Sequence, residues 1–393
     1  MQHDILTVGQ IGCGKFAEAQ DLPNFKKHPQ INLKWCCDTN INRAKAMADM
    51  FAIPNVTDNF MDVLTDPEIK MIKIATTHEV HLRIIEEAAK HGIHVFCEKP
   101  MAMESQEAFK IIRAVRRGGI KLCVDLNRRM APAMHALREK WVEQCHHPKH
   151  QPWRYWEMKR EAMAEEETSH MLITIQDESS SYALGHLDPL SGGGEIIGET
   201  VHWLDLACWF FSPQIPVEIQ AWGSRRLSHG VNLKFSGGDS ATIVFHCSGT
   251  FDFPKEIYQI ASNAALFRSL FFVENEYYGI PGAKREVFPM QHDSMQDRVL
   301  GDGIDAYMKK YALRVQSFGE NSKKIENAKP FMVDKGHYAM LCGFVDAILN
   351  NQPSPCDEMA GYRATWLAQL AMQSLDLKQT MPVPLELLTP VFA

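Results

Sequence analysis

The first 125 residues alternate short apolar runs with longer amphipathic runs, and this alternation strongly constrains the fold. Short apolar runs predict buried strands, and apolar residues at helical spacing predict helices. The predicted strands are residues 5–11, 33–38, 71–75, 94–97 and 121–126. The predicted helices are residues 16–27, 41–51, 80–91 and 104–117. This order is typical of a doubly wound parallel sheet, so we expect an α/β, Rossmann-type N-terminal domain over residues 1–127.

The pattern changes after about residue 127, where runs with strand character follow one another with few helices between them. The expected strands are residues 153–160, 217–222, 231–235, 241–246, 256–261 and 266–273, and the expected helices are residues 199–211, 336–349 and 358–377. Residues 161–191 are polar and acid-rich, which predicts a long loop. We expect residues 128–393 to form an α+β substrate-binding domain with a large, mostly antiparallel, open-faced sheet. Such a face favours a homo-oligomer, a dimer or tetramer.

Composition excludes several classes of function. The 393 residues include 41 Lys and Arg against 48 Asp and Glu, a formal net charge of −7, which argues against nucleic acid as a partner. None of the ten cysteines forms a Cys-x-x-Cys pair, so neither a zinc ribbon nor a thioredoxin-type site is indicated. His78, His81, His91 and His94 are crowded but fall across a helix and a strand, so we predict no metal site. Cysteines inside apolar runs fit a reducing compartment. The N-terminal residues read as a strand, not a signal peptide, and no apolar stretch could cross a bilayer, so we expect a cytoplasmic protein with no membrane contact.

The segment Gly12-Cys13-Gly14-Lys15-Phe16-Ala17 has the Gly-x-Gly-x-x-Ala spacing of a dinucleotide-binding turn. It follows the first predicted strand and begins the first predicted helix. Gly12 allows a tight turn, and Gly14 lets the backbone approach a pyrophosphate, which would lie at the helix N-terminus where free N–H groups favour negative charge. The alternative is a purely structural turn.

Asp38 ends the second predicted strand, 26 positions after Gly12. A carboxylate there can accept hydrogen bonds from the adenine ribose hydroxyls. It would also repel the 2′-phosphate of NADP, so the sequence favours NAD. Arg43 leaves NADP open, because an arginine can bind that phosphate, although Arg43 also fits an exposed position on a helix.

Glu98-Lys99-Pro100 directly follows an apolar strand, at the end where doubly wound folds bind ligands. On spacing alone, a strand-end turn with solvated charges is the alternative. Six segments follow one another in a fixed order along the chain: Val8-Gly9-Gln10-Ile11-Gly12-Cys13-Gly14, Asp38, Ile74-Ala75-Thr76, His81, residues 92–100 and Arg128-Arg129-Met130-Ala131-Pro132. Together they resemble the Gfo/Idh/MocA family (glucose–fructose oxidoreductase, inositol dehydrogenase and rhizopine catabolism), whose members are mostly NAD(P)-dependent dehydrogenases of sugars, cyclitols and related polyols.

In the second half the resemblance rests on Gly192-Gly193-Gly194 and on residues 198–205. It implies that Lys99 contacts substrate and cofactor, that His202 is the catalytic histidine and that Asp205 is the acid one turn later. The glycine motif and the resemblance together give the expected cofactor-binding residues: Gly12, Cys13, Gly14, Lys15, Phe16, Asp38, Arg43, Thr76, His81, Glu98, Lys99 and Arg128.

One position departs from the family. Many members have an aspartate four residues before the catalytic histidine, where this chain has Gly198. Glu199 shares a helix face with His202 and can replace the missing carboxylate. The alternative is a subgroup that binds its substrate in a different pose.

The chemistry of these residues agrees with the resemblance. Oxidising a secondary alcohol needs a base for the hydroxyl proton while hydride moves to the nicotinamide. Histidine suits that role at neutral pH, and Lys99 can hold the alkoxide-like oxygen. Glu199 or Asp205 could orient the imidazole.

We therefore predict an NAD-dependent oxidoreductase acting on a secondary hydroxyl of a sugar, glycoside or cyclitol. The alternative is a glycosidase or lyase that keeps NAD bound and eliminates the aglycone from a transient keto-sugar. A non-catalytic NAD(H) sensor is the third possibility, disfavoured by the presence of both Lys99 and His202.

Other polar and aromatic groups have structural interpretations. The aromatic residues Trp203, Trp209, Phe210 and Phe211 are expected in the core between helix and sheet. His170, His186 and Asp188 are expected to be solvated, and the alternative is that they line the sugar pocket. Lys255-Glu256 is expected to be a charge pair at the start of a strand.

Overall fold

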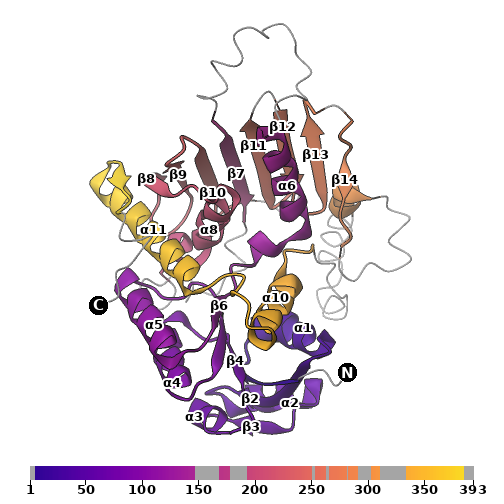
Figure 1. The fold of residues 1–393 in the computed structure, drawn as a ribbon, viewed down its shortest axis with the longest axis vertical. Helices are drawn as coiled ribbons and strands as arrows, with labels where there is room; N and C mark the ends of the chain where they lie inside the picture. The colour runs from indigo at the N-terminus through magenta and orange to yellow at the C-terminus, as the bar shows by residue number, and fades with distance from the viewer. Residues whose placement is uncertain are drawn as a thin grey trace, which may run out of the picture.

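The computed structural model describes residues 5–146, 168–177, 193–249, 253–262, 265–280, 282–290, 302–309 and 333–384. The expected strand at residues 153–160, together with His186 and Asp188, lies outside the described residues. A parallel sheet with its helices forms one end of the molecule and a large second sheet forms the other (Figure 1). The predicted fold class is confirmed.

The N-terminal sheet has six strands in the order β3-β2-β1-β4-β5-β6. They are β1 (Leu6–Ile11), β2 (Ile31–Cys37), β3 (Asn55–Thr57), β4 (Met71–Ile74), β5 (His94–Cys97) and β6 (Leu122–Val124). All five pairs are parallel, and the order is that of a dinucleotide-binding fold. The order reverses between β1 and β4, so the carboxyl ends of these two strands form the expected ligand-binding crevice.

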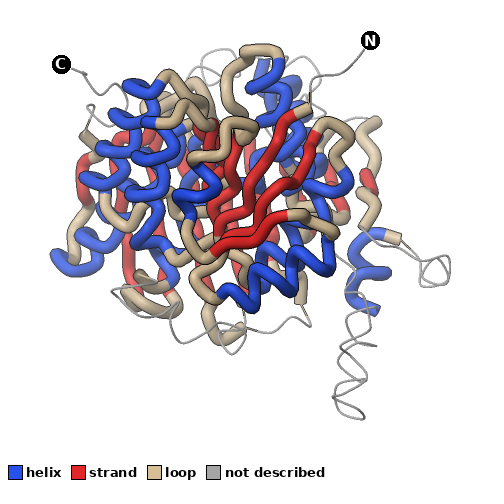
Figure 2. Tube along the Cα trace, turned by 90° about the horizontal axis from the view of Figure 1, so that it is seen from below, coloured by secondary structure: helices blue, strands red, loops and turns tan. Residues whose placement is uncertain are grey.

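Helices cover both faces of this sheet (Figure 2). A π-helical turn (Ala17–Asp21) continues as α1 (Leu22–Lys27), and the other helices are α2 (Ile41–Phe51), α3 (Phe60–Leu64), α4 (His81–Lys90) and α5 (Ser105–Gly118). Local sequence sets their ends. The Asn40 side chain caps α2 by accepting from the backbone N–H of Asn42, and Gly119 ends α5 in a left-handed conformation.

The second sheet has nine strands in the order β14-β13-β12-β11-β7-β10-β9-β8-β15. They are β7 (His170–Gln176), β8 (Pro216–Gly223), β9 (His229–Phe235), β10 (Ser240–His246), β11 (Glu256–Ser262), β12 (Ala265–Leu270), β13 (Glu274–Tyr278), β14 (Glu286–Val287) and β15 (Met381–Pro382). Neighbours are antiparallel except β7 and β10. The predicted, mostly antiparallel sheet is therefore confirmed.

Strand β7 corrects the prediction of a continuous loop over residues 161–191. Met171, Ile173 and Ile175 alternate with more exposed residues and point into the core, as a half-buried strand requires. The acidic and polar residues on either side concealed this short alternation. His170 is exposed, as expected, and bonds to the Ser240 hydroxyl.

Helices α6 (Pro132–His146), α8 (Val201–Phe210) and α11 (Glu358–Leu377) cover one face of the second sheet (Figure 1). Trp203, Phe210 and Phe211 are buried there, as predicted, whereas Trp209 is only half-buried. Helix α6 was not predicted. Its weak amphipathic pattern gives little sequence signal, and tertiary packing decides its structure.

The C-terminal helices return to the N-terminal sheet. Helix α10 (His337–Leu349) packs beside α1, and α11 packs against both α5 and β8 (Figure 1). The division at residue 127 therefore stays a prediction, because α11 packs against elements on both sides of it.

Candidate active site

The glycine turn brings the chain close to the neighbouring strand. Gly12 has φ +93°, and a Cβ there would lie 2.2 Å from the carbonyl oxygen of Ala75. Only glycine fits this close approach. Around Gly14, in contrast, no atom lies within 4 Å of the position that a Cβ would occupy. The backbone at Gly14 is therefore open to a ligand at the start of the helix.

A cavity of about 440 Å³ opens beside this turn. Gly12, Gly14, Asp38 and Arg43 line it, as does Arg83, which sequence reasoning missed. The Asp38 carboxylate accepts hydrogen bonds from the backbone N–H groups of Cys13 and Asn40, both at 2.8 Å, which fix its orientation. Two oxygens offer about four acceptor positions, so Asp38 can still accept from ribose hydroxyls. The open backbone and this carboxylate fit the adenosine and pyrophosphate of NAD.

A second cavity, of about 470 Å³, contains the residues expected to carry the chemistry. Its lining residues are Phe16, Ala75, Thr76, His78, Glu98, Lys99, Asn127, Arg128, Glu199, His202, Lys255, Lys335 and His337. Ala75 and Thr76 line both cavities. The turn after β4 therefore connects the two, and an extended dinucleotide can reach from Asp38 to Lys99 and His202.

Lys99 follows β5 and reaches the segment before α8. Its Nζ donates to the Gly198 carbonyl oxygen at 2.8 Å and to Glu199 Oε1 at 2.5 Å. A lysine ammonium has three donors, and the described residues accept from two of them. The third can donate to a ligand oxygen. Glu199 lies in a π-helical turn (Ile196–Thr200), and its carboxylate binds Lys99. This carboxylate thus holds the lysine in the cavity.

His202 is buried in the first turn of α8 and lines the cavity. Its Nδ1 has no hydrogen-bond partner among the described residues. Burial lowers the pKa of His202 well below its usual value, and the positive charges of Arg128, Lys99, His337 and Lys335 lower that pKa further. The imidazole is therefore neutral at neutral pH, the state in which histidine can accept a proton.

Asp205 does not orient His202, which corrects the expectation for this residue. Both of its carboxylate oxygens accept from the Arg129 guanidinium, and the two side chains are buried. Arg129 also donates to the carbonyl oxygen of Pro355 at 3.0 Å. The Asp205–Arg129 ion pair connects α8 to the segment of Arg129 and, through Arg129, to Pro355, so Asp205 has a structural role.

Arg128 lines the second cavity, and its guanidinium bonds to the second sheet. Its Nε and Nη2 donate to Glu256 at 2.8 and 2.9 Å. Lys335 donates to the same carboxylate at 3.0 Å. Glu256 begins β11, as expected, but it is fully buried. The expected partner of Glu256, Lys255, pairs instead with Asp177 at 2.6 Å. Lys335 and His337 were missed because they lie far along the chain from the other site residues.

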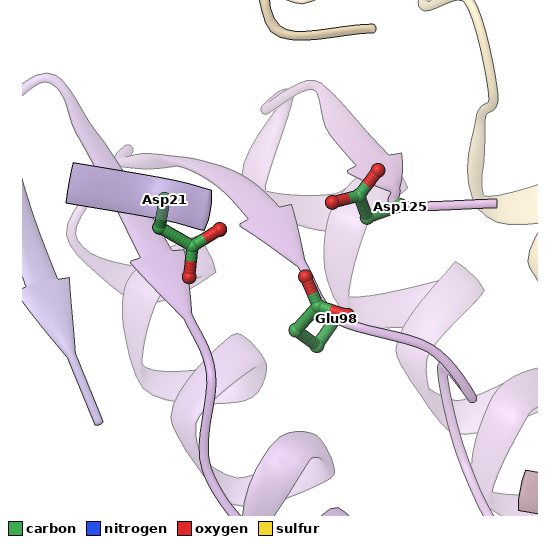
Figure 3. A group of neighbouring side chains, drawn as sticks. All are labelled: Asp21, Glu98 and Asp125. Carbon is green, nitrogen blue, oxygen red and sulfur yellow. The ribbon is translucent and has the colours of Figure 1, made fainter. Parts of the chain in front are cut away.

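Glu98 belongs to a buried cluster that sequence reasoning also missed. Asp21, Glu98 and Asp125 point toward one another from three segments (Figure 3). The Lys73 Nζ lies among them, at 3.2, 2.6 and 3.3 Å respectively. The three acids raise the pKa of Lys73 well above its usual value despite its burial, so it is a fixed cation. The sequence signal that could have indicated this cluster is Lys73 itself, a lysine inside the apolar strand β4.

Three other residues lie differently from expectation. His81 is fully buried and its Nδ1 lies 3.1 Å from the Pro100 carbonyl oxygen, so it supports the turn that carries Lys99 and cannot touch a cofactor. The Cys13 thiol is buried against the Cys37 carbonyl oxygen, so only the Cys13 backbone faces the turn. Lys15 is exposed and lines neither cavity, whereas Phe16 lines the second cavity.

The fold and the two adjoining cavities fit a dinucleotide-dependent oxidoreductase. Residues 6–126 match the family model described as oxidoreductase family, NAD-binding Rossmann fold, of the Gfo/Idh/MocA group. The match covers the N-terminal sheet and its glycine turn and agrees with the resemblance seen in the sequence, and NAD is the cofactor that this family model names.

Comparisons with single proteins extend the similarity beyond residue 126. The uncharacterized oxidoreductase YrbE of Bacillus subtilis is 25% identical over 97% of each chain. A levoglucosan dehydrogenase of Pseudarthrobacter phenanthrenivorans is 32% identical over 35% of this chain and 37% of that protein. A solved levoglucosan dehydrogenase in complex with NADH and levoglucosan has a TM-score of 0.72, with 16% identity over 97% of this chain and 100% of that one, and shows the shared fold.

Among the described residues, the helices are too short or too polar to extend through a lipid bilayer.

Proposed function

We propose that this protein transfers a hydride between a secondary hydroxyl of a sugar, glycoside or cyclitol and NAD. One observation carries the proposal: Lys99 and His202, from different parts of the fold, line one cavity that joins the cavity of Asp38 and the glycine turn. Dehydrogenases of levoglucosan, D-apiose and D-glucosides among the relatives support the substrate class.

The site residues divide the work of alcohol oxidation. Bound NAD supplies the hydride acceptor. Neutral His202 takes the hydroxyl proton, and its depressed pKa keeps the base form available at neutral pH. Lys99, held by Glu199 and the Gly198 carbonyl, directs its remaining N–H to the substrate oxygen and stabilises the charge that develops there. Thr76 lines the junction of the two cavities, where the nicotinamide ribose would lie.

The test is NADH formation with a panel of sugars and cyclitols. We expect the absorbance of NADH to rise over many turnovers with at least one of them. In Lys99→Met, turnover should fall by a factor of at least about 10² while NAD still binds, because the glycine turn and Asp38 are unchanged. Lys90→Met, at an exposed lysine on α4, is the matched control. Near-normal turnover in Lys99→Met would overturn the proposed site.

The same assay separates the elimination chemistry from a dehydrogenase. An enzyme that recycles its NAD forms at most one bound NADH per site and releases an aglycone, whereas a dehydrogenase accumulates NADH in proportion to substrate. The named relatives are oxidoreductases and dehydrogenases, so they give the elimination route no support.

We also propose a cytoplasmic homo-oligomer. The described cysteines are free thiols, which fits a reducing compartment. On the sheet face opposite α6, α8 and α11, Leu172, Trp222 and Tyr278 are exposed. A second copy could cover this face. Light scattering coupled to size exclusion should give a dimer or tetramer, and a monomer at micromolar concentration would contradict the proposal.

A further inference from the structure

The cavity that contains His202 has an excess of positive charge on the side of the second sheet. There, Arg128 and Lys335 share a single carboxylate, that of Glu256. Among the described residues, these two cations and one anion leave a local formal charge of +1, and the Glu98 carboxylate, which lines the same cavity, pairs with Lys73. The other cation on this side, Lys255, is balanced by Asp177, and Lys99 is balanced by Glu199.

The Glu256 carboxylate has no room for a further hydrogen-bond donor. Its Oε1 accepts from Arg128 and Lys335, and its Oε2 accepts from Arg128, from the Tyr258 hydroxyl at 2.6 Å and from the Trp203 indole at 3.1 Å. All of these partners except Lys335 are buried. The site is therefore built around one saturated carboxylate, and the leftover positive charge faces the cavity through the part-exposed side chain of Lys335.

The backbone holds Lys335 in this place. Asn127 donates to the Lys335 carbonyl oxygen at 2.8 Å, and the next residue, Gly336, lies so close to the 127–131 segment that a Cβ would be 2.5 Å from the Ala131 nitrogen. The Lys335 ammonium also lies 4.8 Å from the centre of the Phe271 ring. Burial lowers the pKa of Lys335 to about 8. The positive charges of Lys255 and Arg128 also lower this pKa, whereas the negative charge of Glu256 raises it. An uncompensated charge in such a place is costly unless a ligand pairs with it.

We propose that the substrate carries a carboxylate, which binds Lys335 and Arg128, so that the enzyme oxidises a sugar acid such as a hexuronate and not a neutral sugar. The inference rests on the proposed oxidoreductase function and names its substrate class. A single excess charge matches a monoanionic carboxylate better than a phosphate, which carries nearly two charges at neutral pH. With the carboxylate at Lys335, the ring hydroxyls remain for Lys99 and His202 in the same cavity.

The first experiment compares matched substrates on the wild-type protein saturated with NAD. Glucuronate, galacturonate, mannuronate and gluconate are measured against glucose, galactose and mannose, with glucose 6-phosphate as the other anion. We expect kcat/KM for at least one sugar acid to exceed that of its neutral partner by about tenfold or more. A preference for neutral sugars or for the phosphate would overturn the proposal.

The second experiment uses Lys335→Met. The ratio of kcat/KM for the sugar acid to that for its neutral partner should fall at least about tenfold, and Lys335→Arg should retain most of it. Lys90→Met, which removes an exposed lysine far from Lys335 in the sequence, should keep the wild-type ratio. If Lys335→Met weakens NAD binding and leaves the ratio unchanged, the lysine serves the cofactor and the proposal is wrong.

Calorimetry with the NAD-loaded protein separates this inference from the proposed function. Binding of a sugar acid that depends on Lys335, without NADH formation, would contradict the oxidoreductase function and leave the carboxylate site standing. Oxidation of neutral sugars alone would keep the function and overturn the carboxylate site. If the sugar acids neither bind nor react, the carboxylate site is also overturned.

Discussion

At the scale of single residues, Asp38 determines which dinucleotide can bind. Its carboxylate is fixed by two backbone donors and shares its cavity with Arg43 and Arg83. Asp38→Ala removes the group that repels a 2′-phosphate and leaves both arginines to attract one. We expect the ratio of kcat/KM for NAD to that for NADP to fall at least about tenfold. Asp58→Ala, in the same cavity, should change the ratio less, and an unchanged ratio in Asp38→Ala would show that another residue selects the cofactor.

Glu199 also acts at this scale, through Lys99. The Glu199 carboxylate balances the Lys99 ammonium, one of the charges that lower the pKa of His202. In Glu199→Gln the lysine charge is unbalanced, so the pKa of His202 should fall further. The acidic limb of the kcat/KM profile, where His202 becomes protonated, should then move to lower pH, and kcat should fall because Lys99 loses its anchor. The pH–rate profile measures both effects.

The control for this experiment is Glu218→Gln, at an exposed carboxylate paired with Lys234 on the second sheet. It should have the wild-type profile. A wild-type profile in Glu199→Gln as well would show that Glu199 does not influence the histidine.

At the scale of elements, Gly336 lets α10 begin against the 127–131 segment. It has φ +89°, and a Cβ would lie 2.5 Å from three backbone atoms, those of Ala131, Asn127 and Met130. In Gly336→Ala we expect a loss of more than about 3 kcal/mol in the free energy of unfolding, because backbone cannot move aside as a flexible side chain can. Activity should fall too, since Lys335 and His337 flank this glycine. Urea unfolding and NADH formation measure the two effects.

Gly92 supplies the matched control. It also has a positive φ, +68°, but nothing lies within 4 Å of its Cβ position. Gly92→Ala should therefore cost only the left-handed backbone strain, about 1–2 kcal/mol. Equal losses in the two variants would mean that the close approach at Gly336 contributes nothing.

At the scale of the whole molecule, the Lys73 cluster joins the first helix, two strand ends of the N-terminal sheet and, through the His337–Asp125 pair, helix α10. Burial raises the pKa of Asp21 to about 6, with Asp125 adding to the effect and Lys73 opposing it. A carboxyl group with a raised pKa in the folded state favours folding when protonated. Its contribution is complete below the unfolded pKa of 3.8 and is lost as the pH rises through about 6.

Asp21→Asn keeps a neutral group at this position at every pH. The free energy of unfolding of the variant relative to wild type should therefore rise between about pH 4 and pH 7, by up to about 3 kcal/mol. Urea unfolding across this range measures the difference. Asp376→Asn, at an exposed carboxylate, is the control and should give a small difference that does not change with pH. A constant difference for Asp21→Asn would contradict the raised pKa.

The sequence by itself determined the features that depend on neighbours along the chain. Strand–helix alternation, the spacing of Gly12 and Gly14 and the position of Asp38 after β2 predicted the Rossmann sheet and its NAD cavity. These signals are local, because each arises from the period of a strand or helix or from a turn that needs glycine. The resemblance added Lys99 and His202, which line one cavity.

Only the tertiary structure decided how distant charges pair. From spacing, Glu199 and Asp205 are equivalent partners for His202, yet Glu199 binds Lys99 and Asp205 binds Arg129. Likewise, nothing local indicates that Glu256 collects Arg128 and Lys335 from positions 128 and 79 residues away. A charged side chain can be buried only with its partner, and that partner is fixed by how sheets and helices pack, not by its distance along the chain.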